Sequence, residues 1–87
     1  MAYYVVSAST DLSAKGKRLR SWDLRATAAA VVNLRNGGAS GDIVVPINMA
    51  ITTSASQAYP SPGGKLFPLG VYVEVASGTI VGSVDID

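Results

Sequence analysis

The chain has 87 residues, of which 48% are hydrophobic and 15% are charged, and its formal net charge is +1. It contains neither cysteine nor histidine, which excludes disulfides, thiolate sites and the catalytic triads that use a histidine or cysteine. A chain of this size has a thin core, so its high hydrophobic content predicts that apolar surface packs against another chain. Six of the seven basic residues precede residue 36, so one end of the sequence is basic and the other mildly acidic.

The first part of the chain combines a regular segment with an irregular one. Residues 3–8 are rich in aromatic and β-branched side chains, which predicts the first strand. Residues 9–26 are predicted to form a basic loop or edge-strand segment, because small polar residues precede an irregular alternation. In an extended chain Arg18, Arg20 and Trp22 would share one side of this segment.

Residues 27–35 suit either a helix or a strand. Three consecutive alanines and a serine cap at Ser21 would suit a helix, whereas the valines and leucine of residues 31–34 favour a strand. We expect a strand. The glycine-rich and asparagine-containing run at 36–41 then forms a tight turn, because these residues tolerate positive φ.

The clearest strand signal lies in residues 43–51, where large apolar side chains alternate with other residues at a period of two. Pro46 cannot donate a backbone hydrogen bond, so this strand should lie at a sheet edge or contain a bulge. Residues 59–64 are predicted to form a loop because they are rich in proline and glycine.

The C-terminal part predicts a hairpin, in which residues 71–75 pair with residues 79–86 through a turn at 76–78. With the preceding segments, this gives about five to seven short strands. The fold class is therefore predicted to be all-β, a small antiparallel β-sandwich or barrel in which residues 1–87 form a single domain, and we expect this domain to be oligomeric.

The sequence offers little that suits catalysis or cofactor binding. Nothing selects a pair of carboxylates for acid–base work. Asp85 and Asp87, two residues apart, would suit a hard cation such as calcium, but a charged, frayed terminus is the favoured interpretation. The glycine run at 37–41 lacks the lysine of a phosphate-binding loop. We expect no enzymatic activity, no cofactor and no metal site.

A basic cluster between residues 15 and 20 is the main candidate for contact with a partner. With a tryptophan nearby, it could hold a nucleic-acid backbone and stack a base, although a solvated loop or a contact with an acidic protein is the favoured interpretation. The candidate partner-binding residues are Lys15, Lys17, Arg18, Arg20, Trp22 and Arg35.

Three motifs follow one another between about Ala29 and the end of the sequence, namely VVNLRNG at 31–37, SGDI at 40–43 and GVYVEVASGTIVGSV at 70–84. Their order resembles that in short virion-associated proteins encoded by tailed bacteriophages. The resemblance implies all-β structural subunits, commonly trimers, that decorate or cement the capsid or serve in head fibres or tail attachments. It does not cover the basic segment.

From this resemblance we expect a capsid decoration or cement protein that binds itself and the phage major capsid protein. It would be made in the host cytoplasm and lie on the capsid surface, without a membrane or small-molecule partner. The alternatives are a tail or fibre component that contacts the host surface and a small nucleic-acid-binding β-barrel.

Overall fold

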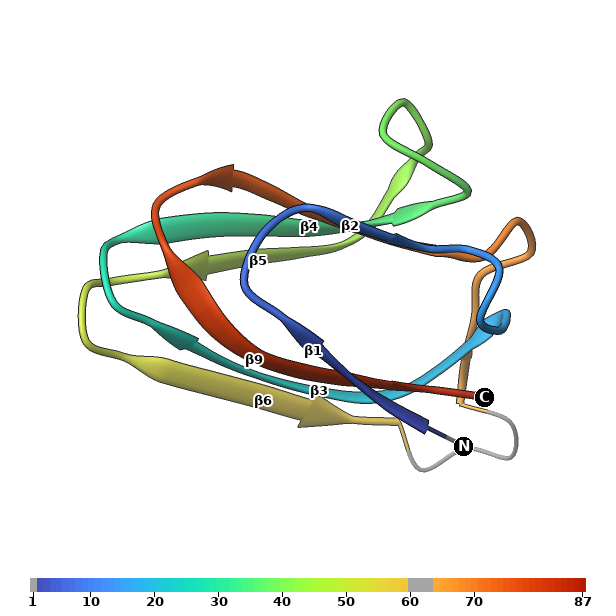
Figure 1. The fold of residues 1–87 in the computed structure, drawn as a ribbon, viewed down its shortest axis with the longest axis horizontal. Coiled ribbons are helices and arrows are strands. Elements are labelled where there is room, and N and C mark those ends of the chain that lie inside the picture. The colour runs from blue at the N-terminus through green and yellow to red at the C-terminus, as the bar shows by residue number, and fades with distance from the viewer. Residues whose placement is uncertain (1, 60–63) are drawn as a thin grey trace.

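Two antiparallel sheets make up the computed structural model, which describes residues 2–59 and 64–87 (Figure 1). The described residues contain no helix, so none of them forms a helix that could span a membrane. The all-β expectation is confirmed. The strands are β1 (Ala2–Val6), β2 (Thr10–Leu12), β3 (Arg18–Ala26), β4 (Ala30–Asn36), β5 (Ile43–Met49), β6 (Ser54–Ala58), β7 (Lys65–Leu66), β8 (Val71–Ser77) and β9 (Ile80–Ile86).

These nine strands exceed the expected five to seven. The difference arises partly because β2 has three residues and β7 has two, which is too short for alternation to be seen in the sequence. Of the loop expected at 59–64, residues 60–63 lie outside the described part of the chain.

The two sheets form the layers of a sandwich. Sheet A has the order β1-β9-β3-β6, with β7 also paired to β3, and sheet B has the order β2-β8-β4-β5. Figure 1 shows the strands of the two sheets facing each other across the molecule. The apolar core lies between them, and its largest fully buried side chains are Phe67, Leu19, Leu24, Leu34, Ile80, Ile86, Val6, Val32, Val71, Val73 and Val84.

Strand β3 lies inside sheet A, with β9 on one side and β6 and β7 on the other. The expected loop or edge strand is therefore wrong for residues 18–26. The irregular alternation has a structural cause, because Leu19 pairs with Ile86 while Ser21 pairs with Asp85. Arg20 is the extra residue of this bulge, and a bulge shifts the alternation of all later side chains by one position.

Residues 30–36 form strand β4, which confirms the strand expectation for most of the contested segment. The helix propensity of the alanines does not decide the structure here, because β4 lies between β8 and β5 and forms hydrogen bonds with both. Ala30 is buried opposite Met49. Tertiary pairing of this kind outweighs intrinsic propensities, which differ by less than about 1 kcal/mol per residue.

Strand β5 is an edge strand of sheet B, which is one of the two alternatives that Pro46 led us to expect. Of its alternating apolar side chains, Ile47 and Met49 are buried, whereas Ile43 is exposed. Ile51, which follows the strand, is also exposed.

The expected C-terminal hairpin does not form. Strand β8 pairs with β2 and β4 in sheet B, whereas β9 pairs with β1 and β3 in sheet A. The turn after Ser77 therefore crosses from one sheet to the other. Gly78 has φ +80° there, and a Cβ on it would collide with the carbonyl oxygen of Ala29. Local alternation marks both strands correctly but carries no information about which strand each one joins.

Candidate binding surfaces

The structure separates the six candidate residues into three environments. Lys15, Lys17 and Arg18 are exposed at the end of sheet A where β3 begins, and Arg20 is half-buried beside them. Trp22 is buried, and Arg35 lies in sheet B. They therefore do not form one surface.

Trp22 belongs to the core rather than to a binding surface. Its side chain is only 8% exposed, and its indole Nε1–H donates to the Tyr59 hydroxyl at 3.3 Å. The bulge at Arg20 explains this orientation, because it lets Leu19 and Trp22, three residues apart, both face the core. The expected shared side of Arg18, Arg20 and Trp22 is wrong for the same reason.

Arg35 is held by groups of its own chain. Its Nε donates to Glu74 Oε1 at 3.0 Å, and its Nη1 donates to the Gly41 carbonyl at 2.7 Å. The buried Asn33 donates from Nδ2 to the same Glu74 oxygen at 2.9 Å. These bonds, from Asn33 first and Arg35 second, lower the pKa of Glu74. Arg35 thus ties β4 to β8 and to the turn before β5.

The basic end of sheet A gains a residue that sequence spacing does not reveal. Strand β7 places Lys65 opposite Leu19, beside the first residues of β3. Lys65 Nζ lies 5.9 Å from the centroid of the Tyr59 ring, which is within the range of a cation–π contact. Lys65 is more than 40 residues away from the other lysines in the sequence, so sequence spacing did not place it beside them.

The same end also carries the acidic last residue. Asp87 exchanges backbone hydrogen bonds with Arg18, at 2.9 and 3.2 Å. Its Oδ2 lies 3.8 Å from Arg20 Nη1, in a partly exposed ion pair. Such pairs contribute little energy, but they reduce the positive potential of the surface around them. The surface is therefore less basic than the sequence alone suggests.

The outer face of sheet A is defined as the side-chain face that points away from sheet B. Register places Tyr3 beside Asp85 and Val5 beside Ser83 on this face. Tyr3 is 70% exposed, Val5 80% and Val81 46%. An open hollow of about 330 Å³ is lined in part by Tyr3 and by small hydroxyl side chains of β3, β6 and β9. The alternation of Tyr3 and Val5 was visible in the sequence, but which side faced solvent was not.

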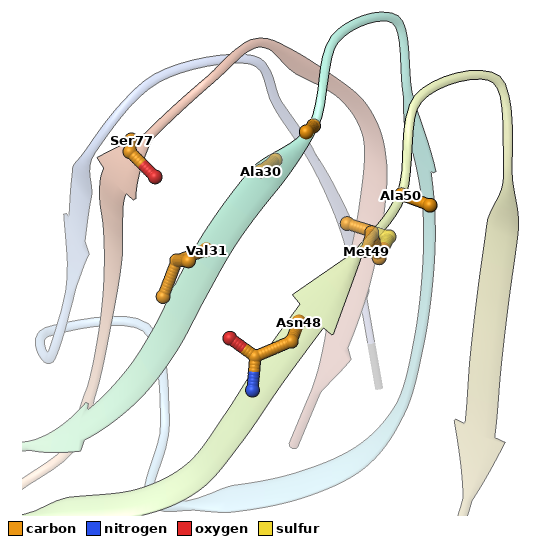
Figure 2. Close-up of a pocket in the computed structure, with 7 residues that line it drawn as sticks. Ala30, Val31, Asn48, Met49, Ala50 and Ser77 are labelled. Atoms are coloured by element: carbon orange, nitrogen blue, oxygen red, sulfur yellow. The ribbon is translucent and has the colours of Figure 1, made fainter.

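A second hollow lies on sheet B near the start of β4, and its volume is about 370 Å³ (Figure 2). Val31 lies between Asn48 of β5 and Ser77 of β8, which are its partners in the two ladders. Figure 2 shows the Asn48 amide beside Val31, and the small Ala30 and Ala50 are among the other lining residues. All of its lining residues are uncharged, so this hollow suits a small side chain of a partner better than a charged ligand.

Asp85 and Asp87, considered above as a cation site, have different environments. Asp85 is buried on the outer face of sheet A, and its Oδ1 has no hydrogen-bond partner among the described residues. Asp87 is exposed and pairs with Arg20. Within residues 2–59 and 64–87, no group of three or more metal-ligating side chains comes together.

Comparisons with models of known protein families, with curated proteins and with solved structures found no significant match.

Proposed function

We propose that this chain is a non-catalytic structural subunit of a bacteriophage virion, namely a capsid decoration or cement protein that binds and stabilises the capsid lattice. The motif order from Ala29 onward supports the virion assignment, through its resemblance to small phage structural proteins. The antiparallel sandwich is compatible with the all-β subunits that this resemblance implies.

The observation that carries a binding role is the exposed apolar part of the outer face of sheet A. Tyr3 and Val5 leave most of their side-chain surface in water, although they lie side by side on one strand. Large exposed apolar groups that gather on one face typically mark an interaction site. In the proposed function this face is covered by sister subunits or by the major capsid protein.

The basic end supplies a second contact of different chemistry. Lys15, Lys17 and Arg18 are exposed there and would face acidic groups of the capsid subunits. Contacts of this kind steer association and fix its orientation more than they add affinity. The apolar face and the basic end together would let one subunit touch several capsid subunits and clamp them against internal pressure.

Mass spectrometry of purified virions of the phage that encodes the chain tests the proposal. We expect the protein in the particles in many copies and, by antibody labelling, on the head. Particles depleted of the protein should rebind it, and the variant with Lys15, Lys17 and Arg18 changed to glutamate should rebind more weakly. Absence from washed virions, although the protein is made during infection, would refute the proposal. Labelling confined to the tail would replace it with the tail or fibre role.

Nucleic-acid binding is the second candidate, and Lys65 favours it by joining the basic end. The burial of Trp22 weakens it, because a base cannot stack on an indole that faces the core. Only contacts between the basic side chains and the phosphate backbone of the nucleic acid would remain, so the binding affinity should fall steeply with added salt. No binding to single- or double-stranded DNA at low salt would end this hypothesis, whereas tight salt-sensitive binding would favour it over the capsid role.

A further inference from the structure

The edge strands of the two sheets are protected to different degrees. An open sheet edge presents unpaired backbone groups, and proteins usually protect it with proline, with charge or by keeping the strand short. In sheet B, β5 contains Pro46, and β2 has three residues including Asp11. In sheet A, β6 carries small and polar side chains that are mostly exposed.

Strand β1 has none of these protections. Its sequence is Ala-Tyr-Tyr-Val-Val, without charge or proline, and among the described strands it pairs only with β9. The side chains that it places on the outer face of sheet A are Tyr3 and Val5, which are 70% and 80% exposed. An apolar, uncharged edge of this kind is suited to pairing with another strand.

We propose that β1 pairs antiparallel with β1 of a second copy of this chain across a two-fold axis, so that two copies of sheet A become one continuous sheet. In a continuous sheet, two residues that lie directly opposite each other point to the same face. The outer-face residues of β1 have odd numbers, so each must lie opposite an odd-numbered residue of the second copy, and the two residue numbers of every pair must sum to an even value. Centring the five-residue strand gives a sum of 8. Tyr3 then lies opposite Val5 of the second copy, and Tyr4 lies on the axis opposite its own counterpart.

The charge pattern favours a second copy as the occupant. A two-fold axis brings residues close to their own counterparts, so a charged residue near the axis faces a like charge. The absence of charge on β1 removes this repulsion. The pairing also joins the exposed Tyr3 and Val5 of both copies into one patch, in which aromatic and β-branched residues are cross-strand neighbours, a favourable combination.

This inference does not rest on the virion proposal, because it concerns only how two copies meet. It also differs from the trimer that the phage resemblance implies, since a two-fold contact between identical edges closes after two copies. Solution mass therefore tests the pairing, and particle binding separately tests the function.

Light scattering and sedimentation of the purified protein test the pairing directly. We expect a mass of about twice 8.9 kDa. Val5→Lys, which places two like charges near the axis, should roughly halve that mass while the circular dichroism spectrum stays that of a β protein. The matched control is Ile43→Lys, which adds the same charge at an exposed position on the protected edge β5 and should remain dimeric. A monomeric or trimeric wild type, or an unchanged mass for Val5→Lys, would overturn the proposal.

Single cysteines test the register, because the natural chain has no cysteine. In Tyr4→Cys the two thiols would face each other at the axis, with Cα atoms about 4.5–5.5 Å apart, which a disulfide can bridge. In Val5→Cys they would be diagonal neighbours at roughly 7–8 Å, beyond easy bridging. Mild oxidation should therefore crosslink the first variant much faster than the second. Equal rates, or faster crosslinking of Val5→Cys, would contradict the proposed register.

Discussion

Trp22 and Arg35 show how a residue that looks like a contact can belong to the scaffold. Tryptophan and arginine are both enriched at interfaces, and both residues were candidates for partner contact in the sequence. In the structure the indole packs in the core and donates to Tyr59, and the guanidinium is bound by Glu74 and by the Gly41 carbonyl. Each side chain has partners within its own chain that lie far away in the sequence or across a turn, so composition alone could not separate the two roles.

Trp22→Ala should destabilise the fold by about 3–5 kcal/mol, because removing a buried indole leaves a cavity as well as losing its burial. Urea unfolding followed by far-UV circular dichroism measures this change. The control is Ile51→Ala, which shortens a 60% exposed side chain and should change stability by no more than about 0.5 kcal/mol. Similar midpoints for both variants would mean that Trp22 is not a core residue.

Glu74 should make stability depend on acid pH. Its hydrogen bonds from Asn33 and Arg35 hold its pKa below the ordinary value of 4.5, so the stability it contributes is present above that pH. This contribution is lost as pH falls through the lower pKa of the folded state. We expect Glu74→Gln to lower the melting temperature at pH 7 and to flatten the decline between pH 5 and pH 2. Asp42→Asn, which removes an exposed carboxylate of the β4–β5 turn, should keep the wild-type slope.

At the scale of elements, the bulge in β3 and the crossing after β8 determine how the strands are arranged. One extra residue at Arg20 makes the alternation of the interior strand β3 irregular, so that Leu19 and Trp22 both face inward. The turn at Gly78 sends β9 into the opposite sheet from β8, where it fills the place between β1 and β3. Both features depend on a few residues whose effect on neighbouring strands is not visible in periodicity.

Gly78→Ala should destabilise the protein by more than about 1 kcal/mol, because position 78 has positive φ and a Cβ there would meet the backbone at Ala29. Gly38 provides a matched control in the β4–β5 turn, since its φ is not positive and a Cβ on it would find open space. Gly38→Ala should be neutral or slightly stabilising. Thermal melts of the two variants compare these effects, and equal losses would show that the crossing does not require glycine.

At the scale of the whole molecule, the two ends of the chain are joined in one sheet. Ala2 lies opposite Ile86, and Arg18 bonds to Asp87. The core is shared by both sheets, so neither sheet can keep its apolar face buried without the other. Small domains organised in this way usually unfold in one cooperative step.

Unfolding in urea should therefore give the same midpoint by Trp22 fluorescence, which reports on sheet A, and by far-UV circular dichroism, which reports on both sheets. If β1 pairs two copies, the midpoint of the wild type should also rise with protein concentration, because association stabilises the folded state by mass action. The midpoint of Val5→Lys should not depend on concentration. Two separated transitions would show that the sheets unfold independently.

The sequence by itself was sufficient for the all-β class, and it favoured a strand over a helix in residues 27–35 and either an edge position or a bulge for the strand that contains Pro46. Alternation, turn clusters and Pro46 are local signals, and the backbone chemistry behind them acts wherever the segment ends up. It also located the exposed basic residues Lys15, Lys17 and Arg18.

Only the tertiary structure decided which strands pair, which way Trp22 faces, and which groups hold Arg35 or join the basic end. Alternation has the same period in every sheet, so it does not indicate that β8 and β9 belong to different sheets. One bulged residue reverses the faces of a strand, and Lys65 reaches β3 only through a pairing between distant segments. Such long-range pairings depend on the whole arrangement of strands and not on the residues of any one strand.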